Sequence, residues 1–137
     1  MIRRYAARLR EAKPCLVVMG IGENGHLAFN DPPVADFEDP FDVKVVTLDD
    51  ACRRQQVGEG HFPTMADVPE RAMTVTVPAL LRAAHVVAVV PEARKAAPVA
   101  AALNGPVTTA CPASALRTHP SATLHLDVGS AGDLGWK

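Results

Sequence analysis

Residues 15–32 read CLVVMGIGENGHLAFNDP, and this stretch decides the fold class. Its first five residues, Cys15 to Met19, form an unbroken apolar run that Gly20 closes. Such a run is typical of a strand buried on both faces of a parallel sheet. Residues 2–12, which end before Pro14, place their apolar positions at helical spacing. The order of helix, strand and glycine-rich loop predicts an α/β protein.

The rest of the chain continues this alternation. Further strands are predicted over 41–48, 72–77, 85–90 and 122–127. Helices are predicted over 49–56, 78–84, 92–103 and 112–116, with Asp49 or Asp50 as a cap, Pro78 in a first turn and Gly105 as a stop. We therefore predict one α/β domain over 1–137, a three-layer fold with a mostly parallel open sheet and helices on both faces.

Charge and composition exclude several classes of protein. A net charge of −1 and a pI near 6.5 give no strong field of either sign, so we expect no nucleic-acid partner and no membrane partner. The sequence has no run of about 18 uncharged apolar residues, and its first residues lack the apolar centre of a signal peptide. We expect a cytoplasmic protein that binds a small molecule.

The three cysteines, Cys15, Cys52 and Cys111, are far apart and form no CxxC pair. No cysteine and histidine stand at the spacing of a zinc site, so we expect free thiols and no metal. Cys15 lies in the apolar run and is expected to fill the core. Cys52 and Cys111 fall near loops.

The loop after Met19 lies where ligands of open α/β sheets bind, beyond the carboxyl end of a strand. Its glycines, Gly20, Gly22 and Gly25, let the backbone turn sharply and approach a ligand closely. Their spacing matches neither G-x-G-x-x-G nor the Walker A pattern, so the glycines alone are weak evidence of function.

His26 follows these glycines, with Asn24 and Asp31 close to it in sequence. An imidazole titrates near neutral pH and can take and return a proton at a sugar hydroxyl, while a neighbouring carboxylate fixes its tautomer. The alternative is structural: His26 hydrogen-bonds a turn and Asp31 starts an Asp-Pro loop. For a single histidine in a loop, the structural role is the more frequent one.

The complete string MGIGENGHLAFNDPP, residues 19–33, resembles the signature of the glucosamine-6-phosphate deaminase family. Every position from Gly20 to Pro32 matches the pattern G-x-G-x-[ND]-G-H-[IL]-[AG]-F-N-[ED]-P. Residues 111–120, CPASALRTHP, resemble a second family segment, and 72–83 and 90–105 each resemble a family strand and helix. The resemblance covers nearly the whole chain and implies the Rossmann-like half of a deaminase fold.

The resemblance implies an enzyme that converts glucosamine 6-phosphate, or a related amino-sugar phosphate, to fructose 6-phosphate and ammonia by ring opening and aldose–ketose isomerisation, without a cofactor. One alternative is 6-phosphogluconolactonase, whose loop runs G-x-G-x-D-G-H-x-A-S-L-F-P, but Phe29, Asn30 and Asp31 favour the deaminase branch. The other alternative is a non-catalytic sugar-phosphate-binding module, although pure binding does not require a proton-transfer pair.

Roles for individual residues also follow from the resemblance. His26 is expected to be the general acid and base that opens the sugar ring, with Asn24 as an orienting group. Asp31 takes the place of a family glutamate, which shortens the side chain by about 1.5 Å. The expected substrate contacts in the loop are Gly22, Gly25 and Asn30.

Lys95 is the expected phosphate ligand because it aligns with a family lysine near the start of a helix, and Arg94 is an alternative donor. The family's phosphate-binding arginine has a weaker counterpart. The position of that arginine falls near Gly58 in this sequence. The nearest arginines are Arg54 and Arg53, about one helical turn earlier, and Arg54 is the expected ligand.

One part of the family's machinery has no counterpart in this sequence. The aspartate that moves a proton between C2 and C1 belongs to an N-terminal region, as does a Gly/Thr-rich phosphate loop. We therefore expect the chain to be the C-terminal part of a longer enzyme and inactive alone. A sheet divided in this way exposes a strand edge, so we expect it to associate with the missing half or with a second copy.

Overall fold

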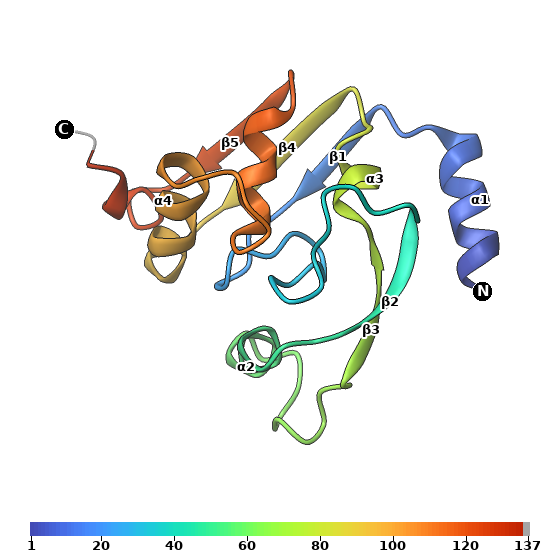
Figure 1. The fold of residues 1–137 in the computed structure, drawn as a ribbon. Helices are drawn as coiled ribbons and strands as arrows, with labels where there is room; N and C mark the ends of the chain where they lie inside the picture. The colour runs from blue at the N-terminus through green and yellow to red at the C-terminus, as the bar shows by residue number, and fades with distance from the viewer. Residues whose placement is uncertain (136–137) are drawn as a thin grey trace.

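The computed structural model describes residues 1–135 (Figure 1). Its α-helices are α1 (Ile2–Ala12), α2 (Asp50–Gly58), α3 (Val77–Leu80) and α4 (Ala96–Asn104). Its strands are β1 (Leu16–Met19), β2 (Val43–Thr47), β3 (Arg71–Val75), β4 (His85–Val90) and β5 (Ala122–Leu126). Three short 3₁₀ helices complete it: η1 (Ala93–Lys95), η2 (Pro112–Thr118) and η3 (Gly132–Leu134). The strand predictions are confirmed to within a few residues.

A parallel three-stranded sheet in the order β1–β4–β5 forms the centre of the fold. Because side chains alternate along a strand, Val86, Ala88 and Val90 of β4 all point to one face and are buried there. On this face α4 packs its own buried residues, Val99 and Ala102, and η2 packs beside α4. The prediction of an α/β protein with a parallel sheet flanked by helices is confirmed.

β2 and β3 form a separate, antiparallel pair, with Val43 opposite Val75. The sequence analysis placed both strands in one mostly parallel sheet. The alternation of apolar residues identifies a strand but does not specify the direction of its partner. Here α2 packs at the end of β2, where Val46, Leu48 and Cys52 form a small core. After α2, the chain runs back as β3, antiparallel to β2.

Three predicted helices differ from the structure. The helix predicted over 78–84 is the four-residue α3, which ends at Leu80. In the segment 92–103, Glu92 has a φ of 83° and therefore lies outside the helical region, and the residues after it form η1 and then α4. The predicted helix over 112–116 is a 3₁₀ helix. The caps at Asp49 and Gly105 are confirmed. Among residues 1–135, no helix combines the length and the apolar character needed to cross a membrane.

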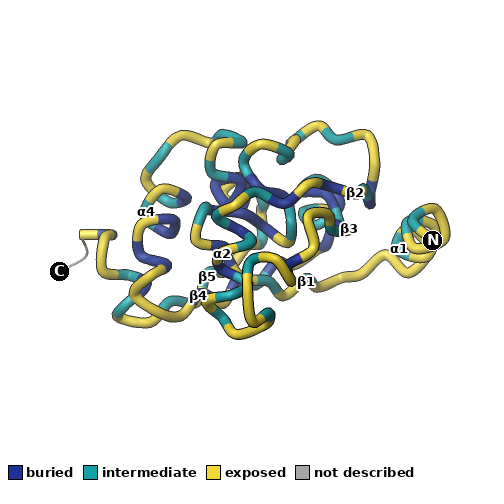
Figure 2. Tube along the Cα trace, turned by 90° about the horizontal axis from the view of Figure 1, so that it is seen from below, coloured by how far each residue is buried: buried dark blue, intermediate teal, exposed yellow. Residues whose placement is uncertain are grey.

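The other face of the parallel sheet is open to solvent among residues 1–135, so the expected third layer, with helices on both faces, is not seen here. Leu16 and Val18 of the edge strand β1 are 48% and 65% exposed, and Val89 of β4 is 49% exposed. Helix α1 stands apart from the body and buries no residue, as Figures 1 and 2 show. Parallel sheets normally have both faces covered, so this face is suited to contact another layer of protein.

Candidate active site

A cavity of about 320 Å³ lies at the carboxyl ends of β1 and β4. The loops that follow these two neighbouring parallel strands meet there, and α2 approaches from the second sheet. The polar groups at the cavity come from Gly22, His26, Gln55, Glu59, Glu92, Arg94 and Lys95. A larger cavity of about 520 Å³ lies beside α1. It contains none of the expected site residues, and we therefore place the chemistry in the smaller one.

His26 lies in this cavity with its Nδ1 nitrogen held by two oxygen atoms. Nδ1 is 2.7 Å from Oδ1 of Asn24 and 3.1 Å from Oδ1 of Asp31. Both oxygens are acceptors, because Asn24 donates through its Nδ2 to Asp31 at 3.1 Å. The neutral ring therefore carries its proton on Nδ1, which leaves Nε2 free to take a proton from a ligand.

Asp31 is completely buried and remains ionised. Burial alone would raise the pKa of Asp31, but hydrogen bonds from His26, from Asn24 and from the backbone N–H of Asp49 together hold that pKa below its usual value. A buried carboxylate in this position stabilises a positively charged imidazole. The geometry is therefore that of a histidine able to gain and lose a proton.

Two glycines shape this loop in different ways. A Cβ atom on Gly22 would lie 2.1 Å from Cε1 of His26, so the imidazole ring fills the space that a side chain would need. The N–H of Gly22 donates to the carbonyl of His26 at 2.9 Å. Gly25 has a φ of 82° and packs against Cys111, so it forms the turn and does not line the cavity.

Asn30 is also buried away from the cavity. Its Nδ2 donates to the carbonyls of Leu27 and Val75, both at 2.8 Å. These bonds tie the loop to β3, so Asn30 supports the site but does not contact a ligand in the cavity.

Arg54 is exposed on α2 and does not line the cavity, which corrects its predicted role. Consecutive residues of a helix point about 100° apart, and α2 turns Gln55 and Glu59 toward the cavity instead. The guanidinium of Arg53 donates to carbonyls of the following loop. Of the predicted cations, Lys95 and the alternative donor Arg94 line the cavity.

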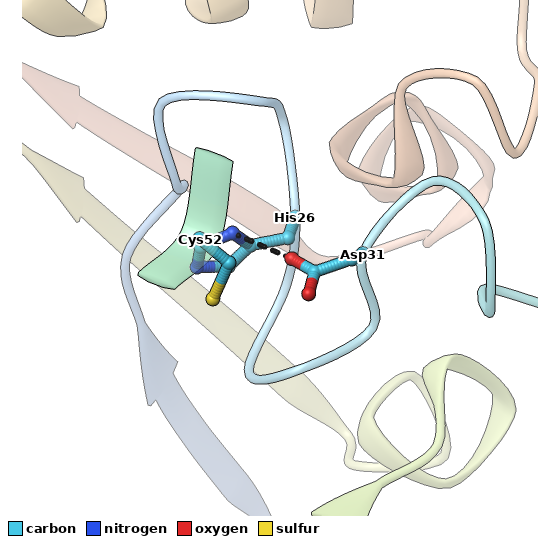
Figure 3. A group of neighbouring side chains, drawn as sticks. All are labelled: His26, Asp31 and Cys52. Atoms are coloured by element: carbon cyan, nitrogen blue, oxygen red, sulfur yellow. Dashed lines mark ion pairs between the residues drawn. The ribbon is translucent and has the colours of Figure 1, made fainter. Parts of the chain in front are cut away.

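Cys52 of α2 brings a thiol to the same group, a contact that the sequence analysis did not predict. One side-chain atom each of His26, Asp31 and Cys52 lies within 4.8 Å of the other two (Figure 3). Burial, together with the nearby charge of Asp31, raises the pKa of the Cys52 thiol to about 12. At this pKa the Cys52 thiol is protonated near neutral pH, so Asp31 is the charged member of the group beside His26.

The three thiols should differ strongly in reactivity. Cys15 is exposed, which corrects the prediction that it fills the core, because it precedes the edge strand β1. With DTNB at pH 8 we expect Cys15 to react within minutes and Cys52 only after unfolding. Cys111 should react slowly, since burial raises its pKa. A Cys15→Ser variant should lose the fast phase; rapid labelling that peptide mapping assigns to Cys52 would contradict the expectation.

The lowered pKa of Asp31 also predicts how stability depends on pH. A carboxyl group whose folded-state pKa lies below its unfolded value stabilises the protein above the unfolded pKa, near 3.8, and loses that contribution as the pH falls through the folded-state pKa. Urea unfolding from pH 5 down to pH 2 should therefore show less acid sensitivity for Asp31→Asn than for the unmodified chain. Equal slopes in both proteins would contradict this account of Asp31.

The model of the glucosamine-6-phosphate isomerases/6-phosphogluconolactonase family matches residues 1–125. A glucosamine-6-phosphate deaminase of Exiguobacterium sibiricum is 35% identical over 130 residues, which are 93% of this chain and 49% of that protein. The structure of a monomeric glucosamine-6-phosphate deaminase is similar with a TM-score of 0.89 at 29% identity, covering 96% of this chain and 53% of the other.

A more distant likeness concerns the fold alone. The 6-phosphogluconolactonase of Trypanosoma brucei gives a TM-score of 0.70 at 21% identity over 98% of this chain and 52% of that structure. The chain spans about half the length of the proteins that it matches.

Proposed function

Because the chain belongs to the family of glucosamine-6-phosphate isomerases/6-phosphogluconolactonase, we propose that it is the C-terminal part of an enzyme that converts an amino-sugar phosphate to a ketose phosphate and ammonia. Glucosamine 6-phosphate is the first candidate substrate. One observation carries the proposal: a single cavity joins the proton-transfer group of His26 to the cations of Arg94 and Lys95. The deaminases among its relatives favour this activity over that of a lactonase.

His26 is the proposed general acid and base of ring opening. Its Nε2 takes the proton of the anomeric hydroxyl and returns a proton to the ring oxygen as the bond between C1 and that oxygen breaks. Asp31 and Asn24 hold the ring through Nδ1, and the charge of Asp31 stabilises the imidazolium that forms between the two transfers. Proton transfer of this kind contributes a factor of roughly 10² to 10⁴ to the rate.

The phosphate group of the substrate is proposed to bind at Lys95 and Arg94, in place of the expected pair of Lys95 and Arg54. Lys95 is buried with its side chain only 8% exposed, and Arg94 presents a guanidinium that can bind two phosphate oxygens at once. Gly22 is the proposed backbone contact with the sugar. Because a charged sugar phosphate does not cross a bilayer unaided, the proposed location is the cytoplasm.

Ammonia release from glucosamine 6-phosphate tests this function. It is measured for the chain alone and for the chain joined to the coding sequence directly upstream of it, called here the extended protein. We expect turnover only in the extended protein. Binding of the sugar phosphate without turnover in both would favour a non-catalytic module, and hydrolysis of 6-phosphogluconolactone would favour the lactonase.

We propose that this chain associates with another polypeptide, which is either the N-terminal half of the enzyme or a second copy of the chain. The edge strand β1, which pairs with β4 on one side only and exposes Leu16 and Val18 on the open face of the sheet, supports this because exposed strand edges invite pairing. Gel filtration with light scattering should give a mass above that of the monomer, and Val18→Lys should shift it toward the monomer. A monomer at high concentration would count against association with itself.

A further inference from the structure

The cationic end of the cavity carries more carboxylates than cations. Arg94 contacts three carboxylates: its Nη1 is 3.0 Å from Glu23, its Nη2 is 3.3 Å from Glu59, and its Nε is 2.9 Å from Glu92. With Lys95, the group holds two positive and three negative charges. In this arrangement it presents no excess of positive charge to an anion.

Lys95 is in a different situation from Arg94. Its Nζ lies 3.7 Å from Oε1 of Glu59, which is too long for a hydrogen bond. Within residues 1–135, no acceptor takes a hydrogen bond from this ammonium group. Although the side chain of Lys95 is mostly buried, its Nζ atom is not enclosed, and it reaches the cavity as a donor that a ligand can satisfy.

Glu59 contacts both cations from the end of α2. Its Oε1 accepts a hydrogen bond from Nε2 of Gln55 at 2.8 Å, and Gln55 in turn accepts from the backbone N–H of Glu23 at 2.8 Å. Burial would raise the pKa of Glu59, but the bond from Gln55 and the charges of Lys95 and Arg94 hold it below the usual value. Glu59 is therefore ionised at neutral pH.

We propose that Glu59 is an internal counter-ion, which the phosphate group of the substrate displaces from Lys95 and Arg94. The inference rests on the proposed function, because that function places a phosphate at these two cations. A phosphate carries between one and two negative charges near neutral pH, as well as several acceptor oxygens, and a carboxylate that kept its contacts would repel it. Glu59 thus weakens the binding of phosphate and selects against anions that cannot replace it.

Calorimetric titration of the chain with inorganic phosphate, at pH 7.5 and fixed ionic strength, tests this inference. Glu59→Gln keeps the size of the side chain and removes its charge, and we expect it to bind phosphate roughly tenfold more tightly. Glu59→Asp, which withdraws the carboxylate by about 1.5 Å, should show a smaller increase. Glu11→Gln removes the same charge from the exposed surface of α1 and should leave the affinity unchanged within twofold.

The possible results separate this inference from the function on which it rests. Equal phosphate affinities in the unmodified chain and Glu59→Gln would overturn the counter-ion role and leave the phosphate site in place. Weaker binding by Glu59→Gln would also overturn it, because Glu59 would then hold the cations in position for the ligand. An absence of binding in all variants would overturn both. Adding Lys95→Met to Glu59→Gln should abolish the gain.

Discussion

His26→Gln in the extended protein is expected to lower the kcat of ammonia release by about 10³-fold. Glutamine can keep a hydrogen bond to the substrate but cannot take up and return a proton at neutral pH. The imidazole of His26 has its Nδ1 fixed by Asn24 and Asp31, so Nε2 is the only ring atom left for this exchange. Steady-state kinetics, with ammonia measured in a coupled assay, gives kcat and KM separately.

The control for this variant is His119→Gln. His119 donates through its Nε2 to the carbonyl oxygen of Ala83, 2.8 Å away, while its Nδ1 accepts from the backbone N–H of Ser121, and it does not line the cavity. The substitution of His119 should leave kcat within a few-fold of the value for the unmodified protein. If His26→Gln retained normal turnover while the protein stayed folded, the proposed ring-opening step would be wrong.

The loop that carries the candidate site could be predicted from sequence because its polar side chains are close together along the chain. Asn24, His26 and Asp31 lie within eight residues, and the glycines between β1 and His26 permit the sharp turn that brings these side chains together. The alternation of strands and helices also placed this loop at the ligand-binding edge of a parallel sheet. Local sequence therefore determines both the nature of this group and its position in the fold.

The contribution of α2 could not be predicted in the same way. Gln55 and Glu59 reach the cavity, and Cys52 lies beside His26 and Asp31, because β2 and β3 pair antiparallel and position α2 against the loop. The cap at Asp49 was visible in the sequence, but a cap does not specify which face of a helix meets a distant loop. Arg54 was assigned to the site because it lies near the position of a family arginine, and that resemblance did not show that α2 turns its neighbour Gln55 toward the cavity instead.

Gly22→Ala is expected to reduce the kcat of the extended protein by about 10²-fold, the cost of displacing a catalytic group by roughly 1 Å. The new Cβ would lie 2.1 Å from Cε1 of His26, well inside contact distance, so the ring must move. The φ of Gly22 is not in the left-handed region, and alanine can therefore adopt its backbone conformation. We expect a local displacement of His26 with only a small change in thermal stability.

Two measurements distinguish this displacement from general damage to the fold. In the chain alone, NMR spectra of the imidazole nitrogens should show altered His26 signals in Gly22→Ala, while the signals of the other histidines stay in place. Gly132→Ala is the matched control, since nothing lies within 4 Å of its added Cβ, and it should change neither the His26 signals nor kcat. Normal kcat in Gly22→Ala would show that the site tolerates movement of the ring, and catalysis would then not depend on the geometry that Gly22 and Asn24 impose on His26.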